Sequence, residues 1–316
     1  MSVFTPLQRE ELEVFLKPYG LGRLLTFEGI AAGSENSNFF ISLEQGEYVL
    51  TLIERGPSED LPFFIELLEL LHRNGLSVPY ALCTERGEAL RTLAGKPALL
   101  QPRLPGKHVA SPNTHQCAEV GRWLAQLHLA TREQIIERRS DRGLEWMEEE
   151  GPTLAMALPE DQLPLLRDSL AEIADLKPRI RALPRANLHA DLFRDNVMFE
   201  GNHLTGVIDF YNACSGPMLY DIAITVNDWC SHPNGELDEE RSEALLAGYS
   251  SLRHFTPAEA ELWRPMLRVA CVRFWLSRLI AAQKFAGQPV LVKDPDEFCR
   301  LLAGRQKLHS ALPFAF

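Results

Sequence analysis

The chain has 316 residues, of which 46% are hydrophobic, and its formal net charge is −11 at pH 7. A chain of this length can bury a large core and is long enough for two domains or lobes. Its acidic residues are spread along the sequence. This argues against a general nucleic-acid or anionic-membrane binder, because either needs a basic field.

The cysteines form no C-x-x-C pair and lie mostly in apolar segments; they are Cys83, Cys117, Cys214, Cys230, Cys271 and Cys299. This pattern predicts reduced thiols rather than a disulfide framework or a zinc site. The N-terminal segment lacks the basic start and apolar block of a signal peptide, and no apolar run approaches the length of a membrane span. We therefore expect a soluble cytoplasmic protein.

The first third of the chain is predicted to be rich in strands. Thr5 to Gln8 supply the N-cap, proline and capping-box residue of a first helix, which Pro18 and Gly20 end. A helix is expected over residues 61–74, with Gly75 placed as its C-cap. The strand-like segments are residues 24–28, 39–41, 48–53, 80–84, 88–93 and 97–101.

Small and polar residues fill the segment 29–38 between the first two strands, among them Ser34, Asn36 and Asn38. Such a loop lets backbone N–H groups approach phosphate oxygens closely. Most loops of this composition are only turns, so the segment alone is a weak indication of a nucleotide site.

Residues 102–106, PRLPG, mark a lobe boundary or hinge because two prolines and a glycine follow a run of strands. Helices are predicted from Thr114, from Leu163 and over residues 220–229, and residues 213–217 are predicted to be a loop. Thr256 caps a long apolar segment whose continuous helix is expected to begin at Pro265. This gives an N-terminal lobe over residues 1–101, a hinge over 102–106 and a helical C-terminal lobe over 107–316.

The most informative stretch is residues 187–212, NLHADLFRDNVMFEGNHLTGVIDFYN. Its apolar runs 197–199 and 204–210 predict the two strands of a hairpin. Within it, the spacing of four polar residues is that of the H-x-D-x-x-x-x-N catalytic loop and the metal-binding aspartate of kinase-like phosphotransferases; they are His189, Asp191, Asn196 and Asp209. The alternative is a polar turn before an ordinary hairpin, which the presence of all four residues disfavours.

Phosphoryl transfer explains why these residue types are needed. The acceptor hydroxyl requires a base, and Mg²⁺ is a small, hard cation that takes one or two carboxylates together with phosphates and water. In this pattern Asp191 orients and deprotonates the acceptor hydroxyl, while Asn196 and Asp209 bind the metal. The predicted cofactors are therefore ATP and Mg²⁺.

The stretches NLHADLFRDNVMF, GVIDFYNA and PMLYDIA resemble the aminoglycoside-phosphotransferase-like, choline-kinase-like branch of the protein kinase fold. The segment Gly121–His128 matches the G-x-x-L-A-x-L-H helix of that branch. Intervening stretches such as GSENSNFFI, YVLTLIER and NGLSVP are most similar to its homoserine kinases, in the same order. The resemblance runs from about Leu24 to the C-terminus. It implies an α+β, protein kinase-like bilobal fold with a β-rich N-lobe and a mainly helical C-lobe.

The resemblance also implies ATP-dependent phosphorylation of the side-chain hydroxyl of L-homoserine, a small-molecule substrate on the route to threonine. By position, His189 would brace the catalytic loop and Asp221 would hold it from behind. Three residues would lie in the loop over the phosphates: Ser34, Asn36 and Asn38. Backbone groups from Gln101 to Arg103 would meet the adenine at the interlobe hinge.

One departure concerns the lysine that kinases place in the third strand to contact the nucleotide phosphates. Here Thr51 lies at about that position. The candidates to replace the lysine are Arg55, Lys96 and Lys107, unless the loop and the metal supply most of the phosphate binding. The glutamate that would partner the lysine is open between Glu66 and Glu69.

Homoserine carries an ammonium group, a carboxylate and a hydroxyl, so its site needs an anion, a cation and room beside Asp191. The flanking candidates are Asn38, Asp195, Tyr211, Asn227, Asp228 and Arg273. An arginine of the last long apolar segment could bind a carboxylate bidentately, and that segment carries Arg268, Arg273 and Arg278.

Two other functions stay open at this point. A related kinase for choline, ethanolamine or an aminoglycoside would use the same catalytic residues. A choline enzyme needs an aromatic cage, for which Trp229, Trp263 and Trp275 are available. The missing strand lysine also leaves room for a nucleotide-binding module without turnover.

Overall fold

The structure is a computed structural model that describes residues 5–30, 36–54, 58–287 and 292–313. The chain divides into two compact units. The first comprises Met1–Gly106 with Thr205–Ile208, and the second comprises Lys107–Leu204 with Asp209–Phe316. None of the helices in the described ranges has the length and hydrophobicity to cross a lipid bilayer.

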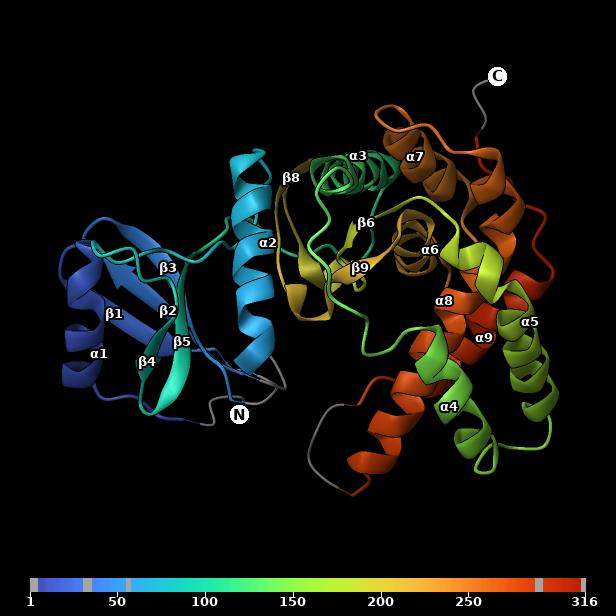
Figure 1. Cartoon of the computed structure of the whole chain (residues 1–316), viewed down its shortest axis with the longest axis horizontal. Coiled ribbons are helices and arrows are strands. Elements are labelled where there is room, and N and C mark those ends of the chain that lie inside the picture. Colours follow the sequence, from blue (N-terminus) through green and yellow to red (C-terminus); the bar gives the residue numbers. More distant parts are fainter. Residues whose placement is uncertain (1–4, 31–35, 55–57, 288–291, 314–316) are drawn as a thin grey trace. The chain divides into compact units, whose positions relative to one another are not determined.

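The first unit is built on a five-stranded antiparallel sheet (Figure 1). Its strands are, in spatial order, β1 (Leu24–Gly29), β2 (Ser37–Leu43), β3 (Gly46–Leu52), β5 (Lys96–Pro102) and β4 (Arg91–Leu93). Two helices accompany the sheet, α1 (Arg9–Leu16) and α2 (Leu61–Arg73). Gly20 has a φ of 67°, a left-handed conformation that glycine adopts without strain, where the sequence predicts the end of the first helical segment.

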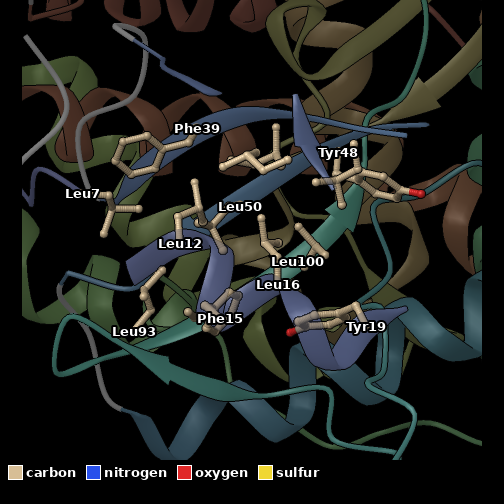
Figure 2. Packing of buried hydrophobic residues seen from close by; sticks show 14 of the residues in the cluster. Leu7, Leu12, Phe15, Leu16, Tyr19, Phe39, Tyr48, Leu50, Leu93 and Leu100 are labelled. Carbon is tan, nitrogen blue, oxygen red and sulfur yellow. The ribbon is translucent and has the colours of Figure 1, made fainter. Parts of the chain in front are cut away.

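The core of the first unit lies between α1 and one face of the sheet (Figure 2). Because side chains alternate along a strand, Ile41 of β2, Leu50 of β3 and Leu100 of β5 can all point to this face. All three are completely buried. Leu12 and Phe15 of α1 belong to the same hydrophobic cluster, so burial of this apolar stripe fixes α1 on the sheet.

The opposite face of the sheet carries a polar row, Asn38 of β2, Thr51 of β3 and Gln101 of β5. Asn38 and Thr51 are cross-strand partners, and the Thr51 hydroxyl donates a 2.7 Å hydrogen bond to Asn38 Oδ1. Gln101 Oε1 lies 3.5 Å from the same hydroxyl. Alternation therefore separates this row from the apolar core face.

The second unit is mainly helical. Its helices are α3 (Thr114–Thr131), α4 (Leu144–Ala155), α5 (Leu163–Arg181), α6 (Met218–Trp229), α7 (Glu239–Ser250), α8 (Pro257–Lys284) and α9 (Pro295–Gln306). The antiparallel pair β6 (Arg185–Leu188) and β9 (Cys214–Pro217) lies beside α6 (Figure 1). The hairpin of β7 (Val197–Glu200) and β8 (His203–Val207) follows the candidate catalytic residues, and β8 from Thr205 on is assigned to the first unit.

Predictions based on periodicity and capping are mostly confirmed. The helices expected from residues 61, 114, 163 and 220 form as α2, α3, α5 and α6, and the β-rich beginning and helical remainder confirm the α+β organisation. Thr256 caps α8 as predicted: its hydroxyl accepts from the Glu259 amide, and the Glu259 carboxylate accepts from the Thr256 amide.

Five local predictions are wrong. Helix α1 begins at Arg9 rather than at Pro6, because the Thr5 amide donates to Ser37 Oγ in β2. Residues 80–84 form no strand, and residues 213–217 form β9 instead of a loop because β6 pairs with them. Helix α8 runs unbroken through Pro265, since the buried side chains around it hold the helix together. The second hairpin strand ends at Val207, three residues early.

Helices α3 and α7 approach each other at two glycines. A Cβ atom on Gly121 would lie 2.0 Å from the carbonyl oxygen of Leu245, and one on Gly248 would lie 2.2 Å from that of Ala118. Both distances are far inside van der Waals contact. The two backbones can therefore pack this closely only while both positions lack a side chain.

We predict that Gly121→Ala lowers the free energy of unfolding by about 3 kcal/mol, because the added methyl forces α3 away from α7. In an exposed helix the same change would instead stabilise by about 1 kcal/mol, so the sign is diagnostic. Urea denaturation measures the effect. Gln126→Ala on the exposed side of α3 is the control and should change stability by less than about 0.5 kcal/mol. A Gly121→Ala protein as stable as wild type would contradict the backbone contact.

Candidate active site

The candidate catalytic loop, residues 189–196, leaves β6 and is held from behind by Asp221 of α6. The two carboxylate oxygens of Asp221 accept hydrogen bonds from the backbone amides of His189 and Ala190, both at 2.8 Å. Ala190 has a φ of 60°, a left-handed conformation that is uncommon for a residue other than glycine. The buried carboxylate therefore stabilises a backbone turn that local preference disfavours.

His128 of α3 connects Asp221 to the rest of the helical unit. Its Nε2 lies 3.3 Å from Asp221 Oδ2, and its Nδ1 lies 2.8 Å from the Tyr249 hydroxyl of α7. Burial lowers the pKa of His128 below its ordinary value, against the opposing effect of Asp221. The neutral imidazole thus donates from Nε2 to Asp221 and accepts from Tyr249 at Nδ1.

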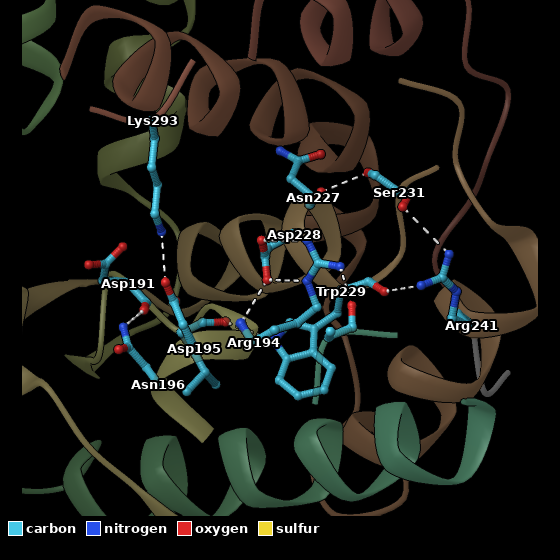
Figure 3. Close-up of polar contacts among 12 residues, drawn as sticks. Asp191, Arg194, Asp195, Asn196, Asn227, Asp228, Trp229, Ser231, Arg241 and Lys293 are labelled. Atoms are coloured by element: carbon cyan, nitrogen blue, oxygen red, sulfur yellow. Dashed lines mark hydrogen bonds and ion pairs between the residues drawn. The ribbon is translucent and has the colours of Figure 1, made fainter. Parts of the chain in front are cut away.

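Asp191 is fixed by contacts on both its backbone and its side chain. Its amide donates to Nδ1 of His189 at 3.3 Å. Its carbonyl accepts from Nδ2 of Asn196 at 2.8 Å, a contact drawn in Figure 3. Nδ2 of Asn212 donates to Asp191 Oδ2 at 3.0 Å, while Nη1 of Arg273 lies 3.9 Å from Oδ1. The side chain is 20% exposed, so the carboxylate is oriented and still accessible.

Asn196 and Asp209 lie at the two ends of the β7–β8 hairpin. Asn196 uses Nδ2 to bind the Asp191 carbonyl, and in the described part of the chain nothing donates to its Oδ1. Asp209 is exposed and has a φ of 63°, which turns the chain sharply after β8 into the segment that ends at Asn212. One amide oxygen and one carboxylate form a hard donor set that suits Mg²⁺ when phosphates and water complete its coordination.

The far side of the candidate catalytic loop is tied to α6 (Figure 3). The carboxylate of Asp228 accepts from the Arg194 amide at 2.7 Å and from Arg194 Nε at 3.1 Å. The Trp229 indole donates to the Leu192 carbonyl at 3.0 Å. Lys293 forms an ion pair with Asp195 at 2.7 Å. Residues on both sides of Asp191 are therefore immobilised by the helical unit.

The nucleotide-binding candidates lie in the first unit. Asn36 directly precedes β2, and its Oδ1 accepts a hydrogen bond from the Glu54 amide at 3.2 Å. Asn38 and Gln101 belong to the polar row, and the guanidinium of Arg103 lies 4.0 Å from the centre of the Phe40 ring. Ser34 lies outside the described residues.

The geometry of the sheet bears on which residue could replace the strand lysine. Thr51 is buried in the polar row and carries no charge. Lys96 lies on the same face of β5 as Ala98 and Leu100, which is the core face and the opposite one from Thr51, and it forms an ion pair with the buried carboxylate of Glu54. Arg55 lies outside the described residues. Glu69 pairs with Arg73, and Glu66 is exposed on α2.

The second unit has a cavity of about 590 Å³ beside β6, β9 and α6, and Asp191 does not line it. Leu188, Cys214 and Tyr220 line it from β6, β9 and α6, and charged side chains of the neighbouring segments complete its wall. Neither Asp191 nor Arg273 is among the lining residues. The cavity therefore adjoins the strands that lead into the loop and not the carboxylate itself.

The structure separates the candidates for binding the rest of an acceptor. Asp228 and Asp195 are engaged by Arg194 and Lys293. Asn227 is buried between Arg305 Nε at 2.9 Å and the Leu267 carbonyl at 2.8 Å. Arg273 lies near the candidate base, with its Nη1 3.9 Å from Asp191 Oδ1.

Asn212 was not predicted to have a role. Its carboxamide donates to Asp191 Oδ2 and accepts from Arg273 Nη2 at 3.2 Å, so it bridges the two charged groups. Its place at the end of the informative stretch is the only signal for it in the sequence, and nothing in a single sequence shows that it meets Arg273 of α8.

Known proteins resemble this chain over most or all of its length. A model of the phosphotransferase enzyme family matches residues 26–255. A homoserine kinase from Pseudomonas aeruginosa (strain LESB58) is 67% identical over 315 residues, which cover 100% of both chains. One from Janthinobacterium sp. (strain Marseille) is 40% identical over 321 residues, covering 100% of this chain and 99% of its own. The solved structure of an amicoumacin kinase with AMP-PNP and Ca²⁺ has a TM-score of 0.66 at 20% identity, covering 95% of this chain and 93% of that one, and shows the same fold.

We predict that Asp221→Asn lowers the free energy of unfolding by about 3 kcal/mol, because a carboxamide cannot accept from both backbone amides and His128. Denaturation in guanidinium chloride measures the loss, and the amides of His189 and Ala190 should exchange hydrogen faster. Asp168→Asn, an exposed change on α5, is the matched control and should be neutral. Equal stability of the two variants would rule out the proposed anchoring by Asp221.

Proposed function

The chain belongs to the phosphotransferase enzyme family, and within it we propose that it is an ATP-dependent kinase that phosphorylates the side-chain hydroxyl of L-homoserine, giving O-phospho-L-homoserine. The observation that supports this substrate best is the 67% identity to a homoserine kinase over the full length of both chains. The phosphoryl-transfer chemistry rests in addition on the geometry around Asp191.

Asp191 acts as the catalytic base in this proposal. Its Oδ2 is occupied by Asn212, while the described residues place no hydrogen-bond donor on Oδ1. A substrate hydroxyl can therefore donate to Oδ1. As its oxygen bonds to the γ-phosphorus of ATP, the proton moves to the carboxylate, the bond from that phosphorus to the β–γ bridging oxygen breaks, and ADP leaves. His189 is a positioning residue, since its ring accepts from the Asp191 amide.

Asn196 and Asp209 would hold the divalent metal through Oδ1 and the carboxylate. When bound, the metal neutralises charge on the β- and γ-phosphates during transfer. The Asn196 amide group also fixes the Asp191 carbonyl, so this residue couples the position of the metal ligands to that of the base. The fit is that of a kinase magnesium site, in which the protein provides only part of the coordination.

The first unit would bind the nucleotide and the second would carry the catalytic loop and the acceptor. Ser34, Asn36 and Asn38 belong to the loop proposed to cover the phosphates, and backbone groups of Gln101 and Arg103 would meet the adenine. Because the polar row is neutral, backbone N–H groups and the metal supply most of the attraction for the phosphates.

We further infer a cytoplasmic location, where ATP and Mg²⁺ are available and thiols stay reduced. All six cysteines are free thiols. Burial raises the pKa of Cys214 and of Cys271 to about 12, which keeps both thiols protonated and unreactive at neutral pH. The phosphorylated product would serve the synthesis of threonine.

A choline kinase is disfavoured by the burial of the three tryptophans available for an aromatic cage. Trp229 and Trp275 are completely buried, and Trp263 is 1% exposed. The Trp229 indole is engaged by the Leu192 carbonyl. Side chains packed in the interior in this way cannot enclose a quaternary ammonium ligand that enters from solvent.

Release of ADP from Mg-ATP tests the substrate directly. The purified chain is offered L-homoserine, choline, ethanolamine and an aminoglycoside at equal concentrations. We predict turnover with L-homoserine at a kcat/KM at least about 100-fold above the others, the discrimination available when buried polar groups lose their partner. Turnover with choline alone would overturn the proposal. ATP binding without turnover of any acceptor would indicate a nucleotide-binding module.

Substitution of the two aspartates separates the base from the metal ligand. We predict that Asp191→Asn lowers kcat by about 10³-fold or more with little change in ATP affinity, because the base acts in the transition state. Asp209→Asn should instead weaken Mg²⁺-dependent ATP binding, which titration calorimetry measures with and without Mg²⁺. Near-normal kcat in the first variant, or unchanged nucleotide affinity in the second, would contradict the respective assignment.

A further inference from the structure

Three arginines of α8 were equal candidates from the sequence, and two of them have carboxylate partners within the protein. Nε of Arg268 donates to Glu172 at 2.8 Å, and a second nitrogen of its guanidinium binds the other oxygen of that carboxylate. Nη1 of Arg278 binds Glu297 at 2.5 Å and the Asp294 carbonyl at 2.8 Å. Neither guanidinium needs a ligand.

Arg273 differs from both in its partners and its burial. It is 4% exposed. Within the described residues its guanidinium makes one hydrogen bond, from Nη2 to Asn212 Oδ1, and its closest carboxylate is Asp191 at 3.9 Å, beyond hydrogen-bond distance. A guanidinium has five N–H donors, so most of them have no protein acceptor. The Phe274 ring, whose centre lies 3.7 Å from the guanidinium carbon, makes a cation–π contact but accepts none of these N–H groups in the ring plane, so burying the donors stays costly unless an anion reaches them.

The position of Arg273 indicates which anion this is. Asn212 bridges it to Asp191, so the guanidinium and the proposed base are separated by one carboxamide. The hydroxyl oxygen and the carboxylate carbon of homoserine are four bonds apart, about 5 Å in an extended chain. A substrate whose hydroxyl rests on Asp191 Oδ1 therefore has its carboxylate within reach of the guanidinium.

We propose that Arg273 binds the α-carboxylate of the acceptor and makes this enzyme specific for amino acids that carry a side-chain hydroxyl. This inference rests on the proposed function. The planar guanidinium can hold a carboxylate through two parallel hydrogen bonds, one from the second N–H of Nη2 and one from the neighbouring Nε or Nη1. It also offsets the repulsion between the substrate carboxylate and the nearby Asp191, which an acceptor without a carboxylate does not experience.

The test is a cycle of two changes, one in the protein and one in the substrate. The protein is wild type or Arg273→Gln, and the acceptor is L-homoserine or 3-aminopropan-1-ol, which is homoserine without its carboxylate. We expect wild type to prefer homoserine strongly. Arg273→Gln should lower kcat/KM for homoserine about 100-fold or more, mostly through KM, and should change it less than about 5-fold for 3-aminopropan-1-ol.

Two further measurements keep the test independent of folding. Wild type offered L-homoserine amide, which has a neutral carboxamide in place of the carboxylate, should lose about as much kcat/KM as the variant loses with homoserine. Arg273→Lys keeps the charge without the planar fork and should fall between wild type and Arg273→Gln. Arg268→Gln, at the internally paired arginine on the same helix, is the matched control and should leave the substrate preference intact.

Each contrary result identifies what has failed. Equal losses on both acceptors in Arg273→Gln would mean that Arg273 only positions Asp191 through Asn212, and would overturn carboxylate binding. Unchanged activity of wild type towards the amide would overturn it as well. If wild type phosphorylates no homoserine at all, the proposed function fails first, and this outcome is visible before any variant is made.

Discussion

The proposed active site depends on the hydrogen bonds that the buried carboxylate of Asp221 accepts. A carboxylate inside a protein is stable only when hydrogen bonds replace its hydration. Here the two backbone amides of His189 and Ala190 and the imidazole of His128 provide them. The same bonds hold Ala190 at a φ of 60°. The direction of Asp191, the next residue, is thereby set by the helical core rather than by the loop.

The proposed nucleotide-binding surface in the first unit differs from the usual kinase arrangement in its charge. The polar row of Asn38, Thr51 and Gln101 is neutral where the kinase pattern has a lysine, and Lys96 is held by Glu54 on the core face. A buried lysine would need a carboxylate partner. In the proposed function, the metal held by Asn196 and Asp209 and the backbone N–H groups therefore supply most of the attraction for the phosphates.

The sequence predicted the features that depend on local spacing. Caps and apolar periodicity located α2, α3 and α5, and fixed offsets singled out Asp191 among many acidic residues. Features that depend on long-range pairing were not predictable. Strand β9 exists because β6 pairs with it, although its Gly and Pro content is typical of a loop. The difference between Arg273 and Arg268 lies wholly in which residues of distant elements face them, so no pattern along α8 reveals it.

The arrangement of Asp191, Asn212 and Arg273 resolves a conflict within the proposed site. A guanidinium bonded directly to the base would occupy the oxygen that the acceptor hydroxyl needs. At 3.9 Å the cation still attracts the carboxylate, while Asn212 takes the hydrogen bonds on both sides. Asn212 thus keeps Asp191 Oδ1 available for the hydroxyl and the remaining Arg273 donors available for the carboxylate. A neutral amide between two charges lets one short site bind both ends of a small zwitterionic alcohol.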